Sequence, residues 1–369
     1  MLVAEIVSRM KDLLIQGGLA MPHQLFTSYY QGGFRGRNGW LTFEDDLSQL
    51  TALRERVLKD LGAEPASEWE LLLSLRHYVH SKMRHDGWRQ AEKHDAFYLL
   101  DQAEQGLAMR CVEHGTLLTQ IYQAFGIPAR VLALQMADPT LGLAKGHVLC
   151  EAWCSDRDQW VVMDSQWDAH WEYAGRPLSA LEAHNLLLSG RVQEMNWVFA
   201  TAAATENDYT RAGTKSLWAQ YFAQIRYGRN MAYLSQPRTK AAALTYLDPR
   251  VPPQFQFQGR PQPSVPERDE SAVWFDCNGV NIAVEGVTYE SSRVTLRLRL
   301  EHSAPWFDRF ELSGDGERVL VEPGLVDWTI TEGEGNFVAR TVNAMGRMGK
   351  PTSLGLFYVP AETMAKAQP

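Results

Sequence analysis

Three pieces of sequence in the middle of this 369-residue chain decide its fold: MRCVEHGTLLTQIYQAFGIPAR at residues 109–130, GHVLCEAW at 146–153 and QWVVMDSQW at 159–167. They supply a thiol, an imidazole and a carboxylate, from Cys111, His147 and Asp164 in that order. In an activated-cysteine site the imidazole takes the thiol proton and the carboxylate orients the imidazole. Whether the three side chains can meet depends on the secondary structure that carries each one.

Cys111 is predicted to begin a helix. Apolar residues recur after it at spacings of one, three and four, and Gly126 and Pro128 then end the pattern. The free N–H groups of a helix N-terminus favour a thiolate, and the adjacent Arg110 adds a positive charge. The N–H of Cys111 is also placed to help form an oxyanion hole. Taken alone, Cys111 is better explained as a buried cysteine in a core helix, because free cysteine is a common core residue.

His147 and Asp164 are predicted to lie on the two strands of a hairpin. Residues 146–153 and 160–164 alternate between two faces, and the polar SDRD at 155–158 is typical of a turn. A turn centred between Ser155 and Asp156 would place residues 147 and 164 opposite one another. A slip of one residue would turn Asp164 to the other face. With the predicted register, the carboxylate can fix the imidazole tautomer and stabilise the imidazolium.

This ordered set of motifs resembles the transglutaminase-like superfamily of cysteine enzymes. Members carry a cysteine at the start of a helix that ends in GIPAR, then HxWxE on one strand and WxxxD on the next. The positions that match here are Cys111, residues 126–130, His147, Glu151, Trp160 and Asp164. Three elements in the right order form a specific signal, whereas each element alone would be weak.

The resemblance covers about a third of the chain at most, and Met109 and Leu149 stand where the family usually has glycine and tryptophan. It implies Cys111 as the nucleophile, His147 as the general base and acid, and Asp164 as the orienting carboxylate. We expect no cofactor. Further residues expected to bind substrate or support the triad are Glu151, Trp88, His85, Arg110, Glu113 and Trp167. Trp88 and His85 are alternative candidates for the second oxyanion donor.

The resemblance implies attack on an amide, peptide or thioester carbonyl through an acyl-enzyme, and the expected substrate is a peptide, a protein or a small amide. A peptidase or amidase is the first expectation. The run of Cys111, Val112 and Glu113 is also similar to arylamine N-acetyltransferases, so an acyltransferase that forms amides is a second. A non-catalytic binding protein that retains the fold is a third. Water or an amine can therefore be the acyl acceptor.

Several other residues have simpler interpretations. Asp168 and His170 are an alternative acid and base, but they follow the strand that carries Asp164. We predict no metal site, because the remaining histidines lack partners at ligand spacing and a strand points His147 away from Cys150 and Cys154. Helical spacing predicts a core stripe at Trp218, Tyr221, Phe222 and Ile225. Nearby polar positions that could meet a substrate, or simply face solvent, are Arg226, Arg229 and Asn230.

Composition and charge narrow the class of protein. Hydrophobic residues make up 45% of the chain and charged residues 22%, as in an ordinary globular protein. The net charge of −8 argues against nucleic acid as a partner, because phosphate binding needs an excess of basic residues. Four cysteines are too few and too clustered for a disulfide framework, so we expect reduced thiols.

The sequence predicts neither export nor membrane binding. Charges at Glu5, Arg9, Lys11 and Asp12 interrupt an apolar helical stripe at residues 3–14, whereas a signal peptide needs an unbroken apolar core. No apolar run approaches the ~20 residues of a membrane span. We therefore expect a cytoplasmic protein, and the oligomeric state stays open.

Four segments are expected along the chain, and together they predict an α+β fold. Residues 1–65 should form an N-terminal helical segment that packs on the core, with a helix at residues 47–61. Residues 66–248 should form a transglutaminase-like (papain-like) catalytic domain with helical additions, opened by a capping box at Ser67 and Glu70. Residues 249–270, rich in Pro, Gly and Gln, indicate a linker. Residues 271–365 alternate in short strands and indicate a C-terminal antiparallel β-sandwich that serves as an accessory domain.

Overall fold

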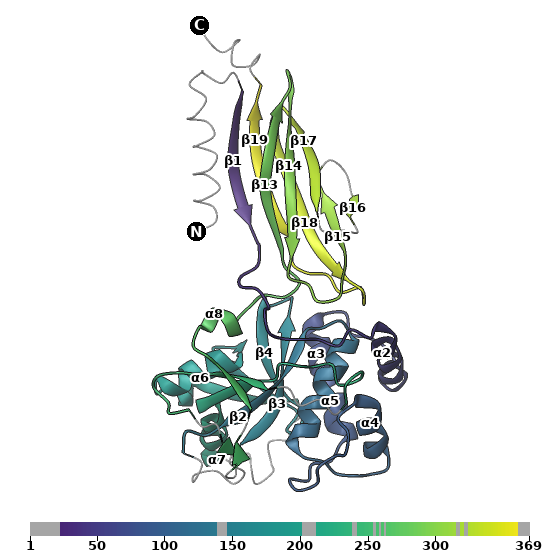
Figure 1. Cartoon of the computed structure of the whole chain (residues 1–369), viewed down its shortest axis with the longest axis vertical. Helices are drawn as coiled ribbons and strands as arrows, with labels where there is room; N and C mark the ends of the chain where they lie inside the picture. Colours follow the sequence, from purple (N-terminus) through teal and green to yellow (C-terminus); the bar gives the residue numbers. More distant parts are fainter. Residues whose placement is uncertain are drawn as a thin grey trace. The chain divides into compact units, whose positions relative to one another are not determined.

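The computed structural model describes residues 23–138, 146–200, 212–237, 242–253, 256–257, 260–261, 263–314, 318–320 and 324–360. The chain forms two compact units (Figure 1). Unit 1 combines Met1–Arg35 with Asp276–Pro369, and unit 2 is Gly36–Phe275. Unit 2, which contains Cys111, His147 and Asp164, is therefore inserted between the first strand of unit 1 and its remaining strands. The apolar stripe at residues 3–14 lies outside the described residues.

Unit 2 contains most of the helices, and local sequence signals explain where they begin. Asp46 accepts hydrogen bonds from the backbone of Ser48 and Gln49 at the start of one helix, and Ser67 accepts from Glu70 at the start of the next. The α-helices are α2 (Leu47–Leu61), α3 (Glu68–Lys82), α4 (Ala96–Glu104), α5 (Cys111–Ala124), α6 (Ala180–Leu188), α7 (Ala212–Ala219) and α8 (Glu270–Val273), with 3-10 turns η1 (Val192–Glu194) and η3 (Gln220–Ala223).

A large mixed sheet runs through unit 2. Its strand order is β12-β9-β8-β2-β3-β4-β5-β6, with β7 also paired to β5. The pairing of β12 with β9 is parallel, and the other described pairs in this sheet are antiparallel. The strands are β2 (Ala129–Gln135), β3 (His147–Cys154), β4 (Gln159–Asp164), β5 (Ala169–Tyr173), β6 (Arg176–Pro177), β7 (Met195–Phe199), β8 (Gln224–Tyr227), β9 (Ala243–Tyr246) and β12 (Ser264–Glu267). A short ribbon of β10 (Gln256–Phe257) and β11 (Arg260–Pro261) stands apart from it.

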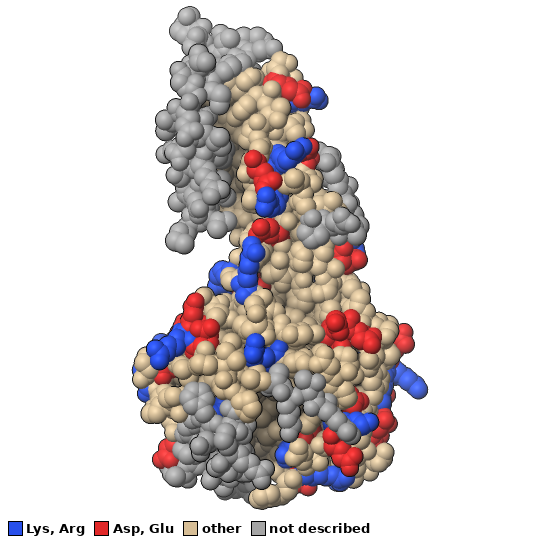
Figure 2. All heavy atoms as spheres, viewed as in Figure 1, with Lys and Arg blue, Asp and Glu red and all other residues tan. Residues whose placement is uncertain are grey.

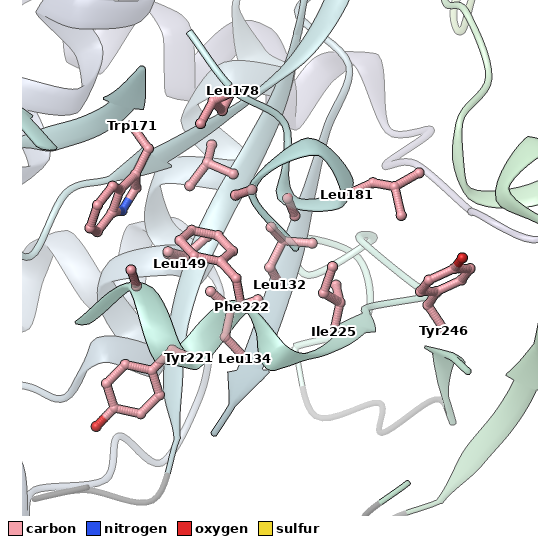
Figure 3. Packing of buried hydrophobic residues seen from close by; sticks show 14 of the residues in the cluster. Leu132, Leu134, Leu149, Trp171, Leu178, Leu181, Tyr221, Phe222, Ile225 and Tyr246 are labelled. Carbon is pink, nitrogen blue, oxygen red and sulfur yellow. The ribbon is translucent and has the colours of Figure 1, made fainter. Parts of the chain in front are cut away.

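Both faces of this sheet are covered. One face carries a hydrophobic core in which Leu132 and Leu149 of the sheet meet Leu181 of α6 and Phe222 of η3 (Figure 3). Helix α5 packs on the other face. Gly115 allows this contact, because a Cβ at that position would lie only 3.0 Å from the backbone of Leu149. The N-terminus of α5 is thereby brought close to the beginning of β3.

Unit 1 is a β-sandwich, as predicted, and it recruits a strand from near the N-terminus. One sheet has the order β1-β19-β18-β15-β16 and the other β13-β14-β17. Apolar side chains from both sheets share one core, including Leu296, Leu298, Phe310 and Leu356. The strands are β1 (Gln24–Gln31), β13 (Val280–Tyr289), β14 (Arg293–His302), β15 (Phe307–Ser313), β16 (Arg318–Leu320), β17 (Leu325–Thr331), β18 (Gly333–Asn343) and β19 (Thr352–Val359).

The structure divides the chain differently from the predicted domains at two places. Residues 24–31, expected inside a helical segment on the catalytic core, form β1 and pair antiparallel with β19. The predicted linker also contains regular structure, because β12 pairs with β9 of unit 2. Long-range strand pairing of this kind depends on a partner elsewhere in the chain, so local composition did not reveal it. The mixed α+β class itself is confirmed.

The surface is mixed in charge. On the face drawn in Figure 2, the basic and acidic side chains of the described residues are interspersed. Over the same residues, no helix is both long and apolar enough to cross a membrane.

Candidate active site

Cys111 is the first residue of α5, and the residues beside it are tied to one another. Arg110 N donates to Glu113 Oε2 at 3.1 Å, and Arg110 Nη2 lies 2.9 Å from Glu113 Oε1. Ala91 N also donates to Glu113 Oε1, which attaches the preceding loop to the helix. Burial would raise the pKa of Glu113, but hydrogen bonds from His94 and Arg110 hold it at about 2. Arg110 and Glu113 thus brace the start of α5, and the charge of Arg110 is matched by Glu113.

Cys111, His147 and Asp164 form one hydrogen-bonded chain. His147 Nε2 lies 2.6 Å from Asp164 Oδ2, and the ring also hydrogen-bonds the Cys111 thiol. Burial lowers the pKa of His147, but the charge of Asp164 and hydrogen bonds to Asp164 and Cys111 together raise it to about 10. Burial raises the pKa of Cys111, yet the hydrogen bond and charge of His147 bring it below its ordinary value. The arrangement therefore favours a thiolate–imidazolium pair.

Asp164 is held in place from both of its oxygens. While Oδ2 faces His147, Oδ1 accepts hydrogen bonds from Gln166 N at 3.0 Å and Trp167 N at 3.4 Å. The side chain is buried, as is His147, whereas Cys111 remains partly exposed. Because Nε2 is engaged by Asp164, Nδ1 is the ring nitrogen left for the thiol.

The predicted hairpin register is wrong by two residues, although Asp164 stays on the predicted face. Cys150 pairs with Met163 and Cys154 with Gln159, so all four residues of SDRD form the loop. Continuing this register places Asp164 opposite Leu149 instead of His147. A shift of two keeps a side chain on its face, and diagonal neighbours lie about 7–8 Å apart, within reach of an imidazole and a carboxylate.

The structure separates the two candidates for the second oxyanion donor. His85 forms a bridge with Met109, and Asp86 N donates to Met109 O at 2.7 Å, so this segment adjoins the residue before Arg110. Burial and the positive charge of His147 lower the pKa of His85, so the imidazole that lies near the triad favours its neutral form. Trp88, by contrast, is 94% exposed. Only His85 is brought towards the site.

Glu151 supports the sheet and does not face the triad thiol. Its Oε2 lies 2.6 Å from Arg130 Nη2, and its Oε1 accepts a hydrogen bond from Ala180 N at 2.8 Å. The guanidinium of Arg130 lies 4.1 Å from the ring centre of Trp160 and 4.2 Å from that of Tyr227. Arg130 and Glu151 are opposite one another on β2 and β3. The last residue of GIPAR and the expected substrate-binding glutamate therefore form one buried ion pair that joins β2, β3 and α6.

An aromatic wall beside His147 was not recognised from the sequence. The ring of Trp218 lies 4.9 Å from that of His147 in an edge contact, and Trp167 packs against Trp218 at 5.3 Å. Trp197 of β7 contacts both tryptophans. Spacing predicted a core stripe that included Trp218, but the stripe is divided among α7, η3 and β8. Phe222 enters the core, whereas Trp218 is only partly buried against it.

The alternative acid and base belong to a separate buried network. Asp168 Oδ1 accepts a hydrogen bond from Arg76 Nε at 2.9 Å, and Asp168 Oδ2 lies 2.6 Å from His77 Nδ1. Arg76 Nη1 lies 2.9 Å from His170 Nδ1. Burial and the charge of Arg76 lower the pKa of His170 to about 4. This network holds the turn after Asp164 against α3 and supplies no part of the triad.

Two further histidines, His80 and His94, lie close to protein oxygen atoms. His80 Nδ1 lies 3.2 Å from the carbonyl oxygens of Ser165 and Gln166, and His94 Nε2 lies 3.5 Å from Glu113 Oε1. Within the described ranges, no group of three or more His, Cys, Asp or Glu side chains is arranged to hold a metal ion.

One segment of the chain matches a known family. Residues 56–165 match the family model of the transglutaminase-like superfamily, and this segment contains Cys111, His147 and Asp164. Among solved structures, the chain is similar to a putative cysteine protease from Cytophaga hutchinsonii at 18% sequence identity and a TM-score of 0.28. That match covers 34% of this chain and 40% of the other, so the chain spans less than half of that protein. No curated protein matches. The transglutaminase-like part of the chain is therefore residues 56–165, the segment that carries all three residues of the candidate site.

Proposed function

We propose that this protein is a cysteine hydrolase, a peptidase or amidase, that cleaves an amide through an acyl-enzyme on Cys111. The observation that carries the proposal is the hydrogen-bonded chain from Cys111 through His147 to Asp164. A buried carboxylate that raises the pKa of an imidazole, and an imidazole that lowers the pKa of a partly exposed thiol, are the parts of an activated nucleophile. The family match of residues 56–165 supports the same class.

In the first half of the reaction, the Cys111 thiolate attacks the carbonyl carbon and the π electrons of the carbonyl move to its oxygen. The N–H of Cys111, at a helix start where no intrahelical acceptor exists, donates a hydrogen bond to that oxygen. The tetrahedral intermediate collapses as the carbon–nitrogen bond breaks. The His147 imidazolium gives its proton to the leaving nitrogen, and a thioester on Cys111 remains.

In the second half, His147 is neutral and acts as the base. It takes a proton from a water molecule that attacks the thioester carbonyl. Collapse of the second intermediate releases a carboxylic acid and restores the Cys111 thiolate beside a protonated His147. Asp164 keeps Nε2 protonated throughout, so that Nδ1 faces the reacting atoms.

The proposal is tested with p-nitrophenyl acetate, a general acyl donor that requires no knowledge of the natural substrate. Intact-protein mass spectrometry at short times should find one acetyl group, and peptide mapping should place it on Cys111. Cys111→Ala is the control, since the remaining thiols of Cys150, Cys154 and Cys277 are buried. Absence of the adduct would refute the nucleophile. Formation of N-ethylacetamide in preference to acetate when ethylamine is added would identify an acyltransferase instead.

A further inference from the structure

Arg226 stands out among the buried arginines that the structure describes. Arg76, Arg130 and Arg226 are each more than nine-tenths buried, with 1%, 1% and 8% of their surface exposed. Arg76 pairs with Asp168 at 2.9 Å and Arg130 with Glu151 at 2.6 Å. Arg226 forms no ion pair with any described residue, and its Nε and Nη2 atoms are buried without a hydrogen-bond partner.

Such an arrangement is energetically unfavourable in the free protein. A buried charge is normally paired and hydrogen-bonded, because its lost hydration is otherwise not replaced. Burial lowers the pKa of Arg226, and no neighbouring carboxylate acts in the opposite direction. Residues that reduce stability in this way are found where function requires them. An anion would supply the hydrogen-bond acceptor that Nε and Nη2 of Arg226 lack.

Strand pairing places Arg226 two strands away from the part of β3 that contacts Cys111. Arg226 of β8 pairs with Ala133 of β2, which in turn pairs with Val148 of β3. Residues that are directly opposite share a face, and Cys150, two residues after Val148, hydrogen-bonds Thr119 of α5 on this face. The backbone of Val148 also hydrogen-bonds the Cys111 thiol. At about 4.8 Å per strand, the backbone of Arg226 lies roughly 10 Å from that of Val148.

We propose that Arg226 binds a carboxylate of the substrate, several bonds removed from the carbonyl that Cys111 attacks. This inference rests on the proposed function of Cys111 and adds the substrate class, an acyl compound with an acidic group. A guanidinium suits a carboxylate because its planar fork can donate two parallel hydrogen bonds. Sequence spacing left Arg226 between a substrate contact and a solvent-facing position, and its burial excludes the second.

The test uses alkylating reagents in place of a substrate. N-iodoacetyl ω-amino acids of increasing chain length are compared with their primary amides, which have the same length and no charge. The Cys111 thiolate displaces iodide in both cases, forming a sulfur–carbon bond as the carbon–iodine bond breaks. The carboxylate reagent of the best-fitting length should react on the order of tenfold faster than its amide, as expected for a charged hydrogen bond.

Arg226→Met should abolish the preference for the carboxylate reagent. Arg229→Met is the control: it removes the same charge from a nearby, partly exposed residue and should keep the preference. Thermal unfolding distinguishes ligand binding from a structural role, because the loss of a structural arginine would lower the melting temperature. Arg226→Met should leave the melting temperature unchanged or higher, because an unpaired buried charge is replaced by an apolar chain. A lower melting temperature, or an unchanged preference for the carboxylate, would overturn the inference.

A failure of the proposed Cys111 nucleophile can be told apart from a failure of the Arg226 anion site. If no reagent labels Cys111, the nucleophile is refuted, and carboxylate binding is then decided with glutarate. At matched ionic strength against chloride, glutarate should raise the melting temperature of the wild type and not that of Arg226→Met. Equal effects on both proteins would refute the anion site.

Discussion

Replacing Asp164 by asparagine removes the charge that holds His147 protonated while preserving the shape of the side chain. His147 has a pKa of about 10 against an ordinary 6.5, a difference of about 3.5, which corresponds to roughly 5 kcal/mol in favour of the protonated ring. The two largest contributions that raise this pKa come from Asp164. Without them burial dominates, and the ring of the variant should be neutral at neutral pH.

The thiol should respond to this loss. The hydrogen bond and charge of His147 are the largest effects that lower the pKa of Cys111, and the direct repulsion from Asp164 is a smaller opposing effect. The pKa of Cys111 should therefore rise in Asp164→Asn, and its alkylation by iodoacetamide at mildly acidic pH should slow at least about tenfold, one pKa unit being tenfold in thiolate. Turnover should fall further, since an asparagine in this place costs on the order of 10⁴ in other triads.

The matched control is Asp156→Asn, which makes the same change in charge at the exposed turn of the same hairpin. It should leave the alkylation profile unaltered. An Asp164→Asn protein that is folded by circular dichroism and alkylated as fast as the wild type would refute the role of Asp164.

Three further predictions concern the residues around the triad. Glu113→Gln removes a buried carboxylate whose pKa is about 2 in the folded protein and 4.5 in the unfolded chain. This carboxylate stabilises the fold above pH 4.5, and the stabilisation is lost as the pH falls through 2. Denaturant titrations should therefore show the wild type losing roughly 3 kcal/mol more unfolding free energy than the variant over that range. Glu151→Gln leaves Arg130 buried and unpaired, and should cost about 3–5 kcal/mol of unfolding free energy by urea titration, with Arg130→Met in the same chain restoring much of it. Burial and the charge of His85 lower the pKa of His114 to about 3, so the folded protein binds fewer protons than the unfolded chain below pH 6.5. The wild type should therefore lose stability as the pH falls, and His114→Leu should lose less. Equal loss of stability in the two proteins would contradict the burial of a neutral His114.

Much of the geometry of the candidate site could be predicted because it depends on local periodicity. Helix α5 begins at Cys111 and ends before Gly126, which has a φ of 74°, the left-handed conformation that glycine adopts most easily. The face shared by His147 and Asp164 follows from strand alternation, which tolerates a shift of two residues. The register itself was not predictable, because SDRD suits a two-residue turn and a four-residue loop equally well.

The features that were missed depend on contacts distant in sequence. Strand β1 is defined by its pairing with β19, more than 300 residues later. The ring of Trp218 meets that of His147 only because α7 and β3 converge, and the spacing of aromatic residues carries no information about that. The ion-pair partners of Arg110 and Glu151 could not be predicted for a related reason. Sequence shows a charge, but whether it faces substrate or is matched by Glu113 or Arg130 depends on the tertiary fold.

The hydrogen bond and charge of His147 lower the pKa of the Cys111 thiol below its ordinary value of 9.0, although burial acts in the opposite direction. The direct measurement is the ultraviolet absorbance of the thiolate as a function of pH, taken as the difference between the wild type and Cys111→Ser. The difference should show a thiolate forming below pH 9.0 in the wild type, and this inflection should move upward in His147→Asn. An inflection at or above 9.0 in the wild type, or one that His147→Asn leaves in place, would show that His147 does not activate Cys111.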